Sequence, residues 1–303
     1  MTIDSKSSEY DHAISQYNEL TNTIKGVKPS EALIAVKEFT VSDNWKHLNF
    51  TQRFDLYALV SSLSVTALDN KTALAAITLA KQQLKLGTDF ERSNKLHIIE
   101  GVYMIYNRKF KEAAELLIES IPTFNCDDFI SIEKCVVYSV FAELLAYSRS
   151  DFKATIVSSS TIRQITLNIP YLDQLIQSYV KCEFSNFMDA LSVVFMNNIE
   201  NDHFIGHHAI YVLSQARLVI YSQYMSAFSS IKVSQMAESF GISEELLRED
   251  IYAFAAHSNL DVRIEGEYIY TTEIDVNEKV YNDITEMGDS LVLRIRRLLP
   301  LVK

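Results

Sequence analysis

The chain has 303 residues, enough for one large core or for two domains. Its 7 glycines and 4 prolines fall far below the roughly 12% that these residues reach together in average proteins, so the composition disfavours sheet-rich and loop-rich folds and favours a helical body. A net charge of −11 argues against nucleic acid and anionic membrane as partners.

The cysteines and the N-terminal segment indicate the compartment. Cys126, Cys135 and Cys182 form no C-x-x-C pair and fit a reducing compartment. No apolar run reaches membrane-spanning length, and the segment MTIDSKSSEYDHA lacks the apolar core of a signal peptide. We therefore expect a protein of the cytoplasm and nucleus without a membrane partner.

The first half of the chain is predicted to be a stack of helical hairpins. Residues 1–30 are polar and rich in serine, and we expect them to be loosely ordered. Small residues then recur at offsets of 0, 12 and 19 in three windows, namely Ser61, Ala73 and Ala80, then Gly101, Ala113 and Ser120, then Ala142, Ala154 and Thr161. Small side chains let antiparallel helices approach closely, as in tetratricopeptide-like repeats. The alternative is the ordinary scatter of small residues in amphipathic helix pairs.

The chain offers few motifs for chemistry. Its glycines lie at least fourteen residues apart, which excludes phosphate-binding loops and nucleophile elbows. One histidine cluster is present, formed by His203, His207 and His208. His203 and His207 could share one helix face, but a metal site at that spacing needs a third ligand, and the nearby candidate, Asp202, is adjacent in sequence and not one turn away. Packing or helix capping is therefore the preferred interpretation. Asp127 and Asp128 are predicted to cap a helix that begins at Phe129. We expect no enzyme activity, no cofactor and no metal.

Residues 230–272 have the pattern of a helix-turn-helix closed by a two-stranded wing. Ser234 and Ser243 are suited to cap the two helices, and Gly241 is suited to end the first. Leu260, Val262 and Ile264 alternate with polar residues, as expected for a half-buried strand. Glu265-Gly266 is suited to a tight turn, after which Tyr268-Ile269-Tyr270 is predicted to return as the second strand. The segment is therefore predicted to be a winged helix.

The charges of the second helix indicate whether this winged helix binds nucleic acid or protein. Its sequence carries four acids against one base, namely Glu244, Glu245, Glu249 and Asp250 against Arg248. Inserting these carboxylates into a DNA groove would place them against the phosphates, which opposes binding. We therefore expect a module that contacts protein.

The last segment, residues 275–299, is predicted to be one long helix ended by Pro300. Apolar residues recur every three or four positions along it, namely Val276, Val280, Ile284, Met287, Leu291, Ile295 and Leu298. Such a continuous stripe favours packing among several helices.

Helical repeats that lead into an acidic winged helix and a long tail resemble the PCI-domain proteins. Four segments resemble the subunit-seven family of the 26S proteasome lid, namely Glu100 to Tyr103, Phe110 to Leu117, Cys182 to Phe187 and Met236 to Gly241. The similarity extends from about residue 90 to the end, and the shorter N-terminal region puts the contacts of the family's outer helices in doubt. The first subunit of the COP9 signalosome is the nearest alternative, followed by translation initiation factor three.

The resemblance implies a mostly α fold, a right-handed tetratricopeptide-like solenoid that ends in a winged-helix PCI module and a long C-terminal helix. The implied domains are a loose segment over 1–30, a solenoid over 31–172, a PCI domain over 173–273 and a bundle helix over 274–303.

The resemblance also implies a non-catalytic scaffold in a hetero-oligomer. The implied partners are other PCI subunits of the lid, the helical bundle that contains the lid deubiquitinase, and the ATPase base. The predicted contact residues are Val262, Ile264, Tyr268, Tyr270, Val280, Ile284, Met287, Leu291, Ile295 and Leu298. An open wing edge could accept a neighbour's strand. A nucleic-acid-binding PCI protein would need a basic face on residues 244–250, and an enzyme would need convergent polar groups in a pocket.

Overall fold

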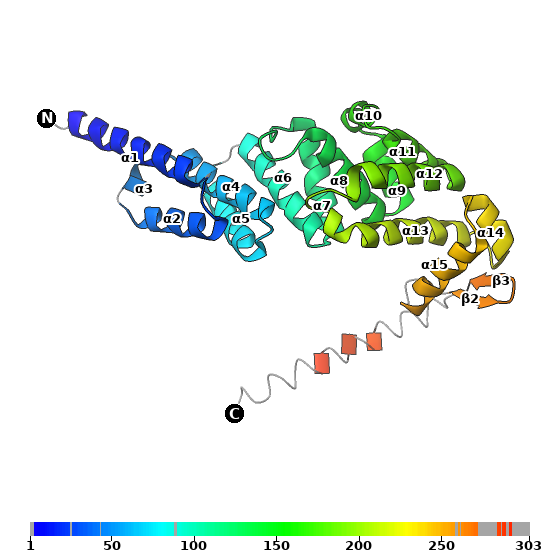
Figure 1. Ribbon diagram of the computed structural model, residues 1–303. Helices are drawn as coiled ribbons and strands as arrows, with labels where there is room; N and C mark the ends of the chain where they lie inside the picture. Colours follow the sequence, from blue (N-terminus) through cyan, green and yellow to red (C-terminus); the bar gives the residue numbers. More distant parts are fainter. Residues whose placement is uncertain are drawn as a thin grey trace. The chain divides into compact units, whose positions relative to one another are not determined.

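The computed structural model describes residues 3–24, 26–42, 44–87, 90–257, 260, 262–271, 284–285, 287–288 and 291–292 (Figure 1). These residues are mostly α-helical, as predicted, with one small sheet. The chain divides into two compact units, Met1–Ala216 and Arg217–Lys303. Within the described ranges, no helix combines the length and the apolar character needed to cross a membrane.

The first unit is a succession of helices. Its α-helices are α1 (Ile3–Ile24), α2 (Pro29–Val41), α3 (Asn44–His47), α4 (Phe50–Thr66), α5 (Asn70–Leu84), α6 (Phe90–Tyr106), α7 (Phe110–Ser120), α8 (Ile132–Ala146), α9 (Arg149–Phe152), α10 (Ser160–Thr166), α11 (Leu172–Lys181), α12 (Phe184–Val194) and the start of α13 (Ala209–Met225). Short 3₁₀ turns are η1 (Ile121–Thr123) and η4 (Gly206–His208), and π-helical turns are η2 (Lys153–Val157) and η3 (Phe195–Ile199).

The N-terminal segment differs from the prediction, because residues 3–24 form the helix α1. Its polar composition hides an apolar series at helical spacing, formed by Ile14, Tyr17, Leu20 and Ile24. Ile24 is buried, and Tyr17 and Leu20 pack against the core made by α2, α4 and α5. Tertiary packing of this stripe therefore overrides the polar composition.

Helical hairpins form where two of the three small-residue windows predicted them. The helices pack in pairs, α4 with α5 and α6 with α7, and a further pair is α11 with α12. The small residues of the first two windows are all buried, namely Ser61, Ala73, Ala80, Gly101, Ala113 and Ser120. The third window was wrong beyond Ala142, because the π-helical turn η2 replaces the expected helix and leaves Ala154 exposed.

The turns of these three hairpins share one backbone geometry. Leu68, Arg108 and Cys182 have φ values of 59°, 59° and 62°. The next N–H group donates in each case to a carbonyl five residues earlier, Asp69 to Ser64 at 3.0 Å, Lys109 to Met104 at 2.9 Å and Glu183 to Ser178 at 3.0 Å. This bond belongs to the Schellman motif, which usually places glycine in the left-handed position. Use of other residues there contributes to the chain's low glycine content.

The second unit contains a strand, two helices and a hairpin after the end of α13. These elements are β1 (Ser230–Lys232), α14 (Val233–Phe240), α15 (Glu244–Ala256), β2 (Val262–Glu265) and β3 (Tyr268–Thr271). Gly241, with a φ of 66°, ends α14, and the Ser243 side chain caps α15, both as predicted. The capping role of Ser234 was wrong, because β1 runs directly into α14 and Lys232 is its N-terminal flanking residue. The boundary at residue 173 rests on the family resemblance and stays a prediction.

Candidate protein interface

The strands form a three-stranded antiparallel sheet in the order β1-β3-β2. Ile231 of β1 lies opposite Ile269 of β3, which lies opposite Ile264 of β2. Ile269 is fully buried, Ile231 is buried and Ile264 is half-buried. Because side chains alternate between the faces of a sheet, this apolar row is the inner face, and Val262 is on the same side.

The outer face of the sheet carries two tyrosines among charges. Tyr268 and Tyr270 are 38% and 40% exposed, and their ring centroids lie 6.3 Å apart. Lys232 Nζ lies 5.7 Å from the centre of the Tyr268 ring, and Arg263 pairs with Glu265 at 3.6 Å. Exposed tyrosines combine a large contact area with a polar end, which suits a protein interface.

The four predicted wing contacts therefore divide between two faces. Tyr268 and Tyr270 are available on the outer face, whereas Val262 and Ile264 belong to the inner face. The alternating pattern predicted the strands correctly but did not say which side faces outward. The charged outer residues Lys232, Arg263 and Glu265 were not among the predicted contacts.

The open edges also differ from a two-stranded wing, because β3 is the central strand. Thr271 N–H donates to Ser229 O at 3.1 Å and Val233 N–H donates to Glu267 O at 2.9 Å. These two bonds show that the backbone groups of residues 229 and 233 point toward β3. Because backbone groups alternate in direction along a strand, those of Ile231 also point toward β3, whereas those of Ser230 and Lys232 point away from the sheet. The strand β1 was missed because three residues are too short to show a period.

The two open edges are not equivalent. Ile269 turns its backbone groups toward β1, so its partner Ile264 turns its own outward from β2. On β2 the outward backbone groups thus belong to a residue whose side chain packs inside. On β1 they belong to Ser230 and Lys232, whose side chains are exposed. An added strand can therefore pair with β1 through residues that contribute little to the core.

The acidic helix α15 is partly engaged inside its own unit. Arg217 Nη1 donates to both oxygens of Asp250, at 3.1 and 2.8 Å, and the Tyr221 hydroxyl donates to the same carboxylate at 3.1 Å. Burial, and then the Asp250 charge, raise the pKa of Tyr221. Asp250 is therefore an internal anchor between α13 and α15, which the count of four surface acids did not reveal.

The rest of α15 keeps an acidic surface. Arg248 Nη1 donates to Gly266 O at 3.0 Å, so this base holds the wing turn. Glu244, Glu245 and Glu249 are exposed, and Tyr252 is exposed on the same helix. This surface is acidic and aromatic, which favours a protein over a nucleic acid as the binding partner.

The predicted tail helix lies mostly outside the described residues. Val276, Val280, Ile295 and Leu298 are not described, whereas Ile284, Met287 and Leu291 have helical backbones. Their exposed fractions are 63%, 71% and 59%. The described part of the stripe is therefore solvent-facing in the isolated chain.

The histidine cluster caps helices, as predicted. His203 Nε2 lies 2.6 Å from the carbonyl oxygen of Thr66, the last residue of α4, and His208 Nε2 lies 2.9 Å from that of Tyr106, the last residue of α6. Arg108 donates to His208 Nδ1 through Nε at 3.1 Å, which holds the ring in this position. The His207 ring packs edge-on against Tyr106. Within the described part of the chain, no three His, Cys, Asp or Glu side chains are grouped as a metal site requires.

The predicted cap at Asp127 and Asp128 was wrong. The helix α8 begins at Ile132 and is capped by Ser131, whose hydroxyl accepts from Lys134 N–H at 3.4 Å. The two aspartates lie exposed in the preceding turn. Phe129 packs against Phe204 and does not start a helix. The cap is instead the serine that directly precedes the helix, where its extended backbone lets the hydroxyl accept from the first turn.

Helical hairpins in the first unit, and a small three-stranded sheet with two helices in the second, define a mostly α protein with a helical-repeat body. The family model described as 26S proteasome subunit RPN7 matches residues 44–155. Over these residues the chain is similar to this family, and relatives named as subunits of the same particle match it over most of its length. The match begins well before residue 90, where the motifs had placed its start.

Relatives in several eukaryotes agree with the family match. The chain is 26% identical over 249 residues to the 26S proteasome non-ATPase regulatory subunit 6 of Dictyostelium discoideum, covering 82% of the chain and 65% of that protein. It is 27% identical to the Arabidopsis thaliana homolog over 82% of the chain and 64% of the relative. COP9 signalosome complex subunit 1 of Arabidopsis thaliana is 21% identical over 68% of the chain and 47% of its own length. The match thus spans somewhat less than two thirds of the first two relatives.

Proposed function

We propose that the chain is a structural subunit of the 26S proteasome regulatory-particle lid and supports ubiquitin-dependent protein degradation. The family match over residues 44–155 is the observation that carries the proposal. The relatives are named as regulatory subunits of the 26S proteasome, and the chain covers more of them, at higher identity, than it covers of the signalosome subunit. The signalosome and initiation factor three are therefore the less favoured alternatives.

The proposed role is scaffolding without catalysis, in the cytoplasm and nucleus. The proposed partners are other PCI subunits of the lid, the bundle that contains the lid deubiquitinase, and the ATPase base. The outer face of the sheet and the β1 edge supply a surface for a neighbouring subunit. The acidic surface of α15 argues against nucleic acid as the partner.

The experiment is purification of the tagged full chain from its own cells, followed by mass spectrometry of the native complex. We expect regulatory-particle subunits in stoichiometric amounts. Recovery of signalosome or initiation-factor subunits instead would contradict the proposal.

A paired substitution tests the surface in the same experiment. Replacing Tyr268 and Tyr270 by serine removes the exposed aromatic contact area and should reduce recovery of the complex at least tenfold. Tyr171 is 51% exposed in the other unit, and Tyr171→Ser is the matched control that should assemble normally.

A further inference from the structure

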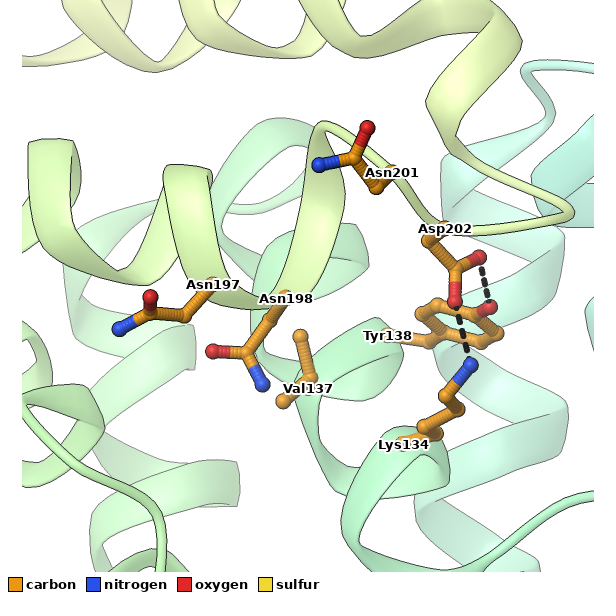
Figure 2. Close-up of a pocket in the computed structure, with 7 residues that line it drawn as sticks. All are labelled: Lys134, Val137, Tyr138, Asn197, Asn198, Asn201 and Asp202. Atoms are coloured by element: carbon orange, nitrogen blue, oxygen red, sulfur yellow. Dashed lines mark hydrogen bonds and ion pairs between the residues drawn. The ribbon is translucent and has the colours of Figure 1, made fainter.

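Asp202 organises a polar network between α8 and the segment that follows η3 (Figure 2). Its side chain is only 2% exposed. One oxygen accepts from Lys134 Nζ at 2.8 Å, and the other accepts from the Tyr138 hydroxyl and from the N–H groups of Phe204 and Ile205 at 3.0 and 3.2 Å. Four donors therefore hold the Asp202 carboxylate in place, three of them on one oxygen.

A pocket adjoins this network. It is lined by Lys134, Val137, Tyr138, Asn197, Asn198, Asn201 and Asp202, and its volume is about 130 Å³. Small-molecule sites typically occupy roughly 300–1,000 Å³, so this pocket suits a short segment of a larger partner. Figure 2 shows Asn197 and Asn198 on the helical turn opposite α8, and Asn201 on the segment that leads to Asp202.

Three carboxamides are the groups that this pocket leaves available. None of the side chains of Asn197, Asn198 and Asn201 hydrogen-bonds another side chain or backbone group in the part of the chain that the structure describes. Asn197 and Asn198 belong to the π-helical turn η3, and such turns are frequent at functional sites. A carboxamide offers two donors and an acceptor, which matches the N–H and C=O groups of a peptide unit.

The charges at the pocket select an uncharged ligand. Lys134 is the cation of the lining, and its ammonium already pairs with the buried Asp202 carboxylate at 2.8 Å. An anion would meet a neutralised pair, and a cation would meet a carboxylate that Lys134 already neutralises. The main remaining binding capacity is neutral hydrogen bonding by the three asparagines.

We propose that this pocket binds the main chain of an extended, uncharged peptide segment through the carboxamides of Asn197, Asn198 and Asn201. Two hydrogen bonds from one carboxamide to one peptide unit fix the direction and register of the segment. Lys134 can add a further bond to a peptide carbonyl, since its ammonium keeps two donors. The site belongs to the first unit, and the inference does not depend on the proposed function.

The test is a nuclear magnetic resonance titration of the full chain, labelled on asparagine side chains. The probe is the capped peptide acetyl-Gly-Ser-Gly-Ser-Gly-amide, and acetate at the same concentration is the second arm. We expect the carboxamide signals of Asn197, Asn198 and Asn201 to shift with the peptide and not with acetate. Asn168, exposed on the same unit, should not shift and provides the internal control.

Substitution adds a quantitative readout. Asn198→Asp keeps the shape but removes two donors and adds a charge, and it should weaken peptide binding about tenfold, because two net hydrogen bonds amount to this factor or more. Asn168→Asp should leave the affinity unchanged, and an unchanged thermal midpoint verifies that each variant folds. Equal shifts at Asn168 and at the pocket, no shifts with the peptide, or stronger shifts with acetate would each overturn the proposal.

Discussion

Gly101 of α6 lies against Leu117 of α7 so closely that a Cβ atom on the glycine would be 2.6 Å from Leu117 Cδ2 and 2.7 Å from Cγ. Leu117 is fully buried and cannot move aside easily. The glycine therefore lets the two helices approach closely at this position, which is a physical reason for a glycine in the segment Glu100 to Tyr103. The neighbouring Glu100 binds Lys81 of α5 at 2.6 Å and joins this hairpin to the preceding one.

Gly101→Ala should destabilise the chain by about 1–3 kcal/mol, because overpacking outweighs the gain of up to about 1 kcal/mol in helix propensity. Urea unfolding of the full chain measures this. Gly26→Ala is the control, since its new Cβ atom would meet its nearest neighbour, Thr23 O, at 3.8 Å. A Gly101→Ala variant as stable as the parent would show that the two helices separate without cost.

The spacing of small residues predicted that α6 and α7 pack closely, because the two helices are consecutive in the sequence and the size of the side chains between them sets their separation. The pairing of His203 with Thr66 was not predictable, since 137 residues separate them and any buried carbonyl could accept. The same holds for Arg217 with Asp250, where a sequence count assigned the acid to the surface. Period-two alternation predicted β2, and the tight turn predicted the returning strand β3. The strand β1 was not predicted, because its three residues are too few to show a period. Sequence therefore indicated the elements, and the polar contacts between them required the structure.

Asp202 should contribute pH-dependent stability. Burial alone raises its pKa, but the hydrogen bonds from Lys134, Tyr138 and the backbone N–H groups of Phe204 and Ile205 more than offset this, so its pKa lies below the usual value. A lowered folded-state pKa stabilises the folded chain above the unfolded pKa of about 4, and this contribution is lost as pH falls through the folded pKa.

The free-energy difference between the parent and Asp202→Asn should thus be constant above about pH 5 and shrink below about pH 4. Urea unfolding of both proteins from pH 3 to pH 7 measures it. Asp127→Asn, at an exposed aspartate, is the control and should differ little from the parent at any of these pH values. A difference that grew toward low pH would contradict the assignment.

Asp250 should act as a structural anchor. Asp250→Ala removes the partner of Arg217 and leaves the fully buried Tyr221 hydroxyl without its acceptor, so we expect a loss of about 3 kcal/mol. The adjacent Glu249 is exposed, and Glu249→Ala should change stability by no more than about 0.5 kcal/mol. Thermal unfolding of the two variants compares them directly, and equal effects would refute the distinction between the two acids.

The β1 edge should be the strand-pairing surface in assembly. Lys232 has a φ of −73°, which proline can adopt, and its N–H points away from the sheet. Lys232→Pro should therefore fold normally but enter the complex poorly, whereas Lys232→Ala, which keeps the N–H, should assemble. Quantitative mass spectrometry of the purified complex measures the ratio of each variant to the other subunits. Normal incorporation of the proline variant would mean that this edge is not used.

The tail, residues 275–303, should be an assembly element. Its apolar stripe would gain on the order of 10 to 20 kcal/mol as an upper bound if fully buried, at about 1.5–3 kcal/mol per side chain. The stripe consists of Val276, Val280, Ile284, Met287, Leu291, Ile295 and Leu298. Ile284, Met287 and Leu291 are more than half exposed in the isolated chain, so this gain requires another apolar surface. Such a stripe left in water favours association.

Deleting residues 275–303 should leave the thermal midpoint of the remainder nearly unchanged and abolish entry into the complex. Leu291→Asp with Ile295→Asp should reproduce the assembly defect in the full-length chain, because burying two unpaired carboxylates in a helical bundle costs several kcal/mol. Glu286→Asp with Asp289→Glu is the charge-matched control, as it leaves the stripe intact. An unfolded truncated chain would mean that the stripe packs within its own chain. A truncated chain that still assembled would mean that the stripe has no role in assembly.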